Sequence, residues 1–112
     1  MRHQLASVHE LARIEMLAGI PGETLGILAE RMEREELRPG DVVLAGVDER
    51  GRFYVVISGM LTAGAGNLLR PGDSFGVLTL FGEPVKAMTP AVVASCDRTT
   101  FEELIRPAIA GA

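Results

Sequence analysis

The sequence predicts an α+β fold with helices at both ends of a run of short antiparallel strands. Apolar residues recur at helical spacing near the two termini, whereas the middle of the chain holds short apolar runs separated by turns. A glycine count of 13 and an aromatic content of 4% also fit many short strands better than a helical bundle. We therefore expect a single domain over residues 1–112, with helices at the ends of an antiparallel sandwich or barrel.

The N-terminal part, residues 1–36, is expected to be helical. A first helix over residues 1–18 would place apolar side chains on one face, at Leu5, Val8, Ala12 and Met16. The segment 19–22 contains two glycines and a proline that break this helix, and a second helix is expected to begin near Pro21. The apolar face of the second helix consists of Leu25, Leu28, Ala29 and Met32. We interpret the mixed-charge run 33–36 as a solvated face.

Short strands are expected in the central part of the chain, after the Pro-Gly-Asp turn at 39–41. Apolar and β-branched runs predict strands at 42–45, 53–58, 60–63 and 92–96. Ser58-Gly59 is typical of a hairpin turn, which would make 60–63 the return strand of 53–58.

A closing helix is expected over residues 97–110. Asp97 stands where an N-cap residue belongs, directly after the last predicted strand. Apolar residues follow at helical spacing, at Phe101, Leu104, Ile105 and Ala108. Pro107 is expected to end or kink this helix early.

Charge and cysteine content argue against two kinds of site. With 11 basic and 15 acidic residues the net charge is −4, and a nucleic-acid-binding protein usually has a basic excess. We therefore expect no direct contact with nucleic acid. Cys96 is the single cysteine, so the chain has no internal disulfide, and its apolar neighbours predict a small buried side chain rather than a reactive thiol.

The remaining composition argues against an enzyme and against a membrane protein. No histidine follows His9, so the predicted strands lack the ligands of a metal-binding jelly-roll enzyme, and no catalytic Ser/His/Asp or Cys/His set is available. We expect no catalytic residue, no metal and no cofactor. No apolar run reaches the roughly 18 residues of a membrane helix, and the polar N-terminus differs from a signal peptide. A cytoplasmic location without membrane insertion is expected.

Taken in order, several segments resemble the cyclic nucleotide-binding domain family, from about Leu11 to Ile105. These segments are LAGIP at 17–21, LRPGDVV at 37–43, FYVVISG at 53–59, LRPGDSFG at 69–76 and DRTTF at 97–101. The resemblance implies a β-roll, a jelly-roll barrel, over residues 37–96, flanked by the N-terminal helices and the short C-terminal helix. It also implies a ligand cassette over residues 75–87, built from a short helix and a loop between two strands.

The resemblance places the candidate ligand-binding residues in this cassette, at Phe75, Gly76, Val77, Leu78, Thr79, Lys86 and Ala87. Phe75 and Gly76 match the family's Phe-Gly-Glu start, but Val77 replaces the glutamate that would accept a hydrogen bond from the ribose. Val85 stands where the family has an arginine for the phosphate. Lys86, one residue later, is the candidate replacement, although it is a point charge and not a planar fork.

These replacements predict weak or altered nucleotide binding. A hydrogen bond to a charged group contributes about 1.5–3 kcal/mol, so losing two anchors would lower affinity on the order of a hundred- to ten-thousand-fold. The segment from Ala87 to Asp97 is also short for the family, and Pro90 interrupts it. We therefore expect the back wall of the pocket to differ as well.

Three functions are compatible with the sequence. The first is a regulatory sensor that binds a cyclic nucleotide such as cAMP, or another small anion. The second is a ligand-free protein-interaction or oligomerisation module that has kept the β-roll, with a protein partner or a homodimer. The third is the effector domain of a transcription regulator that lacks its DNA-binding part. The sequence does not decide among them.

Overall fold

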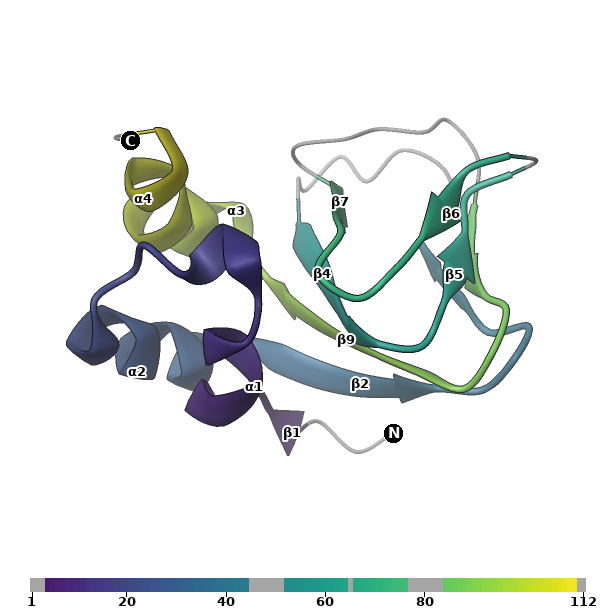
Figure 1. The fold of residues 1–112 in the computed structure, drawn as a ribbon, viewed down its shortest axis with the longest axis horizontal. Coiled ribbons are helices and arrows are strands. Elements are labelled where there is room, and N and C mark those ends of the chain that lie inside the picture. The colour runs from purple at the N-terminus through teal and green to yellow at the C-terminus, as the bar shows by residue number, and fades with distance from the viewer. Residues whose placement is uncertain (1–3, 45–51, 65, 77–83, 111–112) are drawn as a thin grey trace.

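The computed structural model describes residues 4–44, 52–64, 66–76 and 84–110, which form two antiparallel sheets with helices packed against one of them (Figure 1). The five-stranded sheet has the order β1-β2-β9-β4-β7 and contains β1 (Gln4–Leu5), β2 (Glu33–Leu37), β4 (Phe53–Ser58), β7 (Ser74–Gly76) and β9 (Ala91–Cys96). The four-stranded sheet has the order β3-β8-β5-β6 and contains β3 (Val42–Leu44), β5 (Leu61–Thr62), β6 (Leu68–Leu69) and β8 (Val85–Ala87). The predicted α+β class and β-roll are confirmed.

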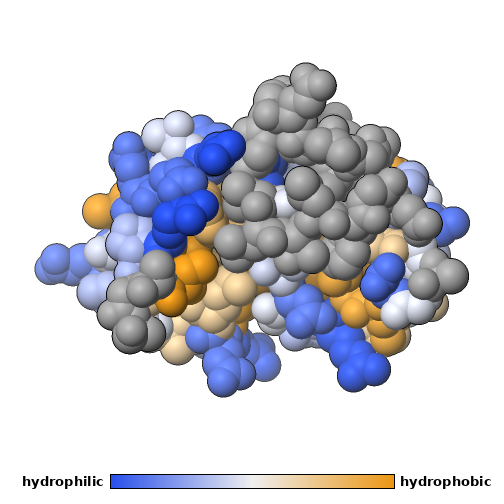
Figure 2. Space-filling model, turned by 90° about the horizontal axis from the view of Figure 1, so that it is seen from above, coloured by the Kyte–Doolittle hydropathy of each residue, from blue (hydrophilic) through white to orange (hydrophobic). Residues whose placement is uncertain are grey.

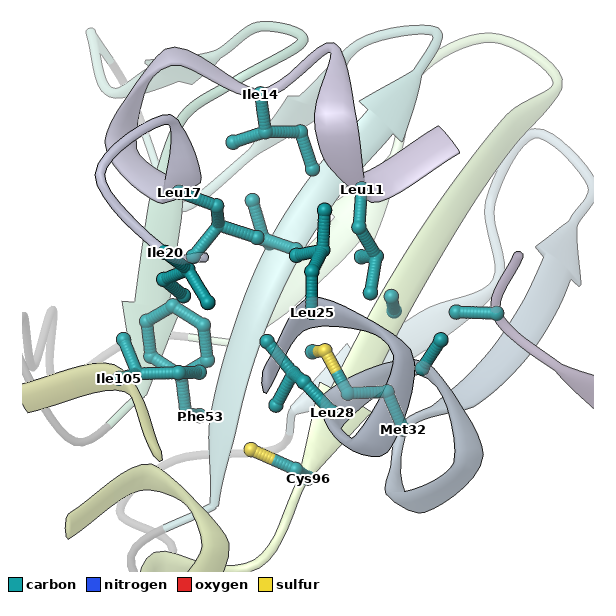
Figure 3. Close-up of a cluster of buried hydrophobic side chains, with 14 of the residues drawn as sticks. Leu11, Ile14, Leu17, Ile20, Leu25, Leu28, Met32, Phe53, Cys96 and Ile105 are labelled. Atoms are coloured by element: carbon teal, nitrogen blue, oxygen red, sulfur yellow. The ribbon is translucent and has the colours of Figure 1, made fainter. Parts of the chain in front are cut away.

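The central strands β4 and β9 separate two hydrophobic cores. Side chains alternate along a strand, so Phe53 and Val55 face the helices while Tyr54 and Val56 face the four-stranded sheet. All four are buried, which is why this strand is an almost continuous apolar run. Figure 3 shows the helix-side core, where side chains from both ends of the chain meet Phe53 and Cys96. The expected burial of Cys96 is confirmed.

The predicted helix over residues 1–18 is wrong. Gln4–Leu5 is a strand, helix α1 spans only Val8–Ala12, and a 3-10 helix, η1, follows at Glu15–Leu17. A capping box explains the late start, because the Ser7 hydroxyl accepts a hydrogen bond from the backbone N–H of Glu10 at 3.1 Å. The broken path buries Leu11, Ile14 and Leu17, whereas the predicted face residues Leu5, Val8 and Ala12 are exposed.

Helix α2 spans Gly22–Arg31 and confirms the second predicted helix, but it ends earlier than expected. The run 33–36 is not helical, because it belongs to β2, which pairs along its whole length with β9. Because the side chains of this run are charged, β2 has no apolar periodicity by which the sequence could predict it. They are held by ion pairs, since Arg34 lies 3.1 Å from Glu10 and 2.9 Å from Glu36.

The predicted hairpin between β4 and β5 is also wrong. After β4 the chain crosses to the other sheet, where β5 pairs with β6 and β8. Gly59 makes the crossing possible with a φ of +79°, and a Cβ on this residue would lie 2.6 Å from the Cα of Ala91. A glycine turn can therefore carry the chain between sheets as readily as it closes a hairpin.

The C-terminal helical segment is continuous to residue 110. It comprises α3 (Arg98–Thr100), the π-helix η2 (Phe101–Ile105) and α4 (Arg106–Ala110). The early end expected at Pro107 is wrong, whereas the expected kink stays a prediction. In η2 the N–H of Arg106 donates to the carbonyl of Phe101, five residues earlier, and this wider turn gives the proline ring room that an α-helix denies it.

The surface over the helical half is mixed in character. Seen from above, hydrophilic side chains alternate there with hydrophobic ones (Figure 2). Within the described residues, no helix combines the length and the apolar character that a membrane crossing requires.

Asp97 caps the C-terminal helices as predicted, accepting a hydrogen bond from the N–H of Thr100 at 2.8 Å. Hydrogen bonding from Thr100 lowers the pKa of Asp97, so the folded state favours the carboxylate. We expect Asp97→Ala to lower the free energy of unfolding by about 1 kcal/mol at pH 7. A depressed pKa stabilises only above the unfolded value, so this difference should shrink as the pH falls below about 4.

Urea unfolding at several pH values measures this effect. Asp97→Asn is the control, because it keeps an acceptor that does not titrate in this range. A wild-type-to-alanine difference that is the same at pH 3 and pH 7 would show that the carboxylate charge plays no part in the cap.

Candidate functional site

The candidate site begins where β7 ends, at Phe75 and Gly76. The Phe75 ring stacks on Tyr54 with 4.8 Å between ring centroids and 3° between planes, and both rings belong to the roll interior. Gly76 has a φ of +100°, and a Cβ there would collide with the carbonyl oxygen of Arg52. Gly76 is therefore required by the fold itself, before any ligand is considered.

Strand β8 forms the other described part of the cassette, and its side chains alternate between the two faces of its sheet. Val85 and Ala87 are buried in the core that contains Phe75, whereas Lys86 is exposed. Lys86 lies beside Val42 and Thr62 in register, on the outer face of the four-stranded sheet. The structure thus brings Phe75 and Ala87 together and places the Lys86 side chain on the opposite face from them.

Part of the predicted site lies outside the described residues. This applies to Val77, Leu78 and Thr79. Their roles in ligand binding stay predictions.

The described wall of the roll interior is apolar. Leu61, Phe75 and Val85 are fully buried in it, and Ser95 is the one polar residue that is buried on this side of β9 within the described part of the chain. Among the described residues, every buried polar side-chain atom has a hydrogen-bond partner. The same residues contain no cluster of side chains able to hold a metal ion. This wall suits a largely uncharged, flat molecule better than an anion.

Arg52 is a cation near the site that sequence reasoning missed. Its guanidinium donates to the Ser95 hydroxyl at 2.8 Å and lies 3.6 Å from Glu33, and the side chain is only 25% exposed. Arg52 directly precedes β4 and hydrogen-bonds to Ser95, the residue opposite Tyr54, so its side chain lies on the same side of the sheet as Tyr54. Arg52 could have been identified as a site residue from its position, because it lies directly before β4 and opposite the end of β7.

Cys96 offers no chemistry to the site. Burial is the main reason that the pKa of its thiol is raised to about 12, and Asp97 adds to this shift. The side chain faces the helices and not the roll interior. A thiol that stays protonated at neutral pH is a poor nucleophile.

We expect Gly76→Ala to destabilise the protein more than Gly72→Ala. Both glycines have similar positive φ values, +100° and +95°, but a Cβ at Gly72 meets nothing within 4 Å. The pair therefore separates backbone strain from the collision with Arg52, which should add at least about 1 kcal/mol. Urea unfolding of the two variants measures the difference. Equal losses of stability would show that the added Cβ at residue 76 is accommodated beside Arg52 without a further loss of free energy.

Comparisons with known proteins agree with this architecture. The family model described as "Cyclic nucleotide-binding domain" matches residues 34–107. No curated protein matches the chain. The regulatory subunit of a cAMP-independent protein kinase A from Trypanosoma brucei is a similar solved structure, with 26% identity and a TM-score of 0.78 over 93% of this chain and 42% of that one.

Two further structures show the same fold. The regulatory domain of Toxoplasma gondii PKA with cAMP has 22% identity and a TM-score of 0.75, over 92% of this chain and 45% of that one. The regulatory subunit of a cAMP-independent protein kinase A from Trypanosoma cruzi, bound to guanosine, has 22% identity and a TM-score of 0.73, over 93% and 42%. This chain spans less than half the length of each of the three structures. Because the family model runs from β2 through the C-terminal helices, the chain belongs to the cyclic nucleotide-binding domain family.

Proposed function

We propose that this domain is a regulatory binding module whose roll takes a nucleoside or nucleotide through its base and sugar, with weak affinity for cAMP. The observation that carries the proposal is the orientation of β8. Val85, at the position of the family's phosphate-binding arginine, is fully buried on the inner wall, whereas the neighbouring Lys86 points outward. No cation from the described part of β8 therefore faces the roll interior.

The missing cation matters more for a cyclic nucleotide than for a nucleoside. A phosphate taken into an apolar roll needs charged hydrogen bonds to offset its desolvation. A nucleoside carries no formal charge, so an apolar wall such as that around Tyr54 and Phe75 disfavours it less than it disfavours a phosphate. The T. gondii structure contains cAMP and the T. cruzi structure contains guanosine, so proteins that include this fold bind both kinds of ligand.

The proposed binding wall consists of the cassette residues Phe75, Gly76, Val77, Leu78, Thr79 and Ala87. Lys86 stays a proposed phosphate contact, and its outward position predicts a small contribution. Arg52 is a second proposed cation, although its pairing with Ser95 and Glu33 reduces what it can offer a ligand. A cytoplasmic location stays a prediction.

A ligand-free interaction module is the second candidate. It is favoured by the close packing of the roll, where the Tyr54–Phe75 stack and the buried Leu61 and Val85 occupy the described interior. In this case Val85 contributes to stability and not to an altered pocket. The two candidates differ in one measurable property, which is binding of any nucleoside or nucleotide.

Isothermal titration calorimetry with cAMP, cGMP and guanosine tests the proposal. We expect guanosine to bind at least as tightly as cAMP, and Lys86→Ala to change the cAMP affinity by less than about threefold, as for an exposed charge. Flat titrations with all three ligands at millimolar concentration would overturn the proposal and favour the ligand-free module. A tight cAMP complex that Lys86→Ala abolishes would show that Lys86 reaches the phosphate.

Val85→Arg tests the orientation of β8 directly. An arginine on the inner wall should raise the cAMP affinity roughly ten- to a hundredfold, the equivalent of one charged hydrogen bond, and leave guanosine binding unchanged. Val42→Arg is the matched control, because it adds the same charge on the outer face, where Val42 is 54% exposed. Thermal unfolding verifies that each variant is folded. If a folded Val85→Arg protein gains no cAMP affinity, the loss of the arginine does not explain the altered site.

A further inference from the structure

Residues of β1, α1 and α2 line a shallow apolar groove. These three elements lie in the lower part of Figure 1. Its volume is about 470 Å³. Leu5, Val8 and Ile27 line it and are 60%, 43% and 44% exposed. These are three of the six large hydrophobic side chains exposed among the described residues, so half of that exposed set gathers at one place. A patch of this kind, with polar residues at its rim, is typical of an interaction site.

Gly26 forms part of the groove between these side chains. It lies in the interior of α2, where glycine is among the least favourable residues. A Cβ at this position would meet nothing within 4 Å, and its backbone needs no positive φ. Neither backbone geometry nor internal packing therefore requires a glycine. The missing side chain leaves open space in the groove into which a residue of a partner can pack.

The described charged residues at the rim of the groove are both acidic. Glu23 and Glu30 line it seven residues apart on α2, about 10 Å along the helix axis. Both are exposed, and among the described residues no lysine, arginine or histidine lines the groove. Neither glutamate forms an ion pair with another described residue, whereas Arg31 on the same helix pairs with Glu103. The two carboxylates are therefore available to a partner.

We propose that this groove binds an amphipathic helix of a protein partner, with apolar residues flanked by lysine or arginine. Apolar side chains of that helix contact Leu5, Val8 and Ile27, and one of them fills the space above Gly26. Basic residues seven positions apart on the partner match the separation of Glu23 and Glu30. This is the mode in which a helix lays its apolar face into a hydrophobic groove, with charge setting the choice of partner.

A second copy of the chain fits the groove less well than a basic helix. Two copies that met at this face would bring Glu23 and Glu30 of one against the same pair of the other. The net charge of −4 adds to this repulsion. The groove is formed by β1, α1 and α2, whereas Gly76 lies on β7 (Figure 1). The inference therefore does not depend on nucleotide binding.

Two synthetic peptides of about 15 residues test the proposal on the full chain. One is an alanine-rich helix with two leucines between two lysines placed seven residues apart, and its twin has glutamates in place of the lysines. Fluorescence anisotropy should show the lysine peptide binding about tenfold more tightly than its twin at low salt, with the preference reduced at high salt. Replacing Glu23→Lys and Glu30→Lys together should reverse the preference.

Gly26→Leu tests the packing part of the proposal. It should weaken binding of the lysine peptide at least tenfold while leaving the unfolding midpoint unchanged or higher, because leucine is the better helix former. Gly22→Leu is the matched control, since Gly22 lies on the same helix with nothing within 4 Å of an added Cβ, and it does not line the groove.

Three results would overturn the proposal. The first is no binding of either peptide at millimolar concentration, and the second is binding of the lysine peptide that Gly26→Leu does not change. The third is self-association in sedimentation experiments that Gly26→Leu abolishes, which would assign the groove to a second copy of the chain.

Discussion

The antiparallel pairing of β4 with β9 is the interaction on which both halves of the structure depend. It runs from Phe53 opposite Cys96 to Ser58 opposite Val92 and forms the wall shared by two cores. On one side the Phe53 ring stacks on Phe101 with 5.0 Å between centroids, which ties the C-terminal helices to the sheet. On the other side Tyr54 stacks on Phe75 at the start of the cassette. Because close-packed interiors respond to small volume changes, neither core can be altered without an effect on the other.

The two-residue period of a strand also determines which side chains of β8 face the inside of the roll. Within the described part of β8, Val85 and Ala87 face inward, so the residue between them must face outward. A basic residue shifted by one position along a strand changes faces and is no longer equivalent to the residue it replaces. For a residue in a binding motif, the face of the sheet on which its side chain lies therefore says more about its role than a match of residue type between two sequences. For β8 the result is an apolar inner face with the charge of Lys86 on the outside.

The fold was predictable wherever local signals agree with the tertiary structure. The periodicity of α2, the alternation and apolarity of β4 and β9, and the cap at Asp97 each point to the structure that forms. Prediction failed at β2, where charged residues held by ion pairs form a strand with no apolar alternation. It failed again at Gly59, because the same turn residue serves a hairpin and a crossing between sheets. The exposed Leu5 and Val8 were assigned to a buried face because spacing alone does not show where a helix begins.

The sequence by itself determined the α+β class and the places of α2, β4, β9 and the C-terminal helices, since periodicity and capping signals are local. The replacement of two charged anchors by Val77 and Val85 is implied by the family resemblance and stays a prediction. Only the tertiary structure decided which sheet each strand joins, that Lys86 points away from the roll interior and that Arg52 lies against Ser95. It also decided that Gly26 lies in an open groove between two carboxylates. These features depend on strand register and on contacts between residues far apart in the chain, which no local pattern encodes.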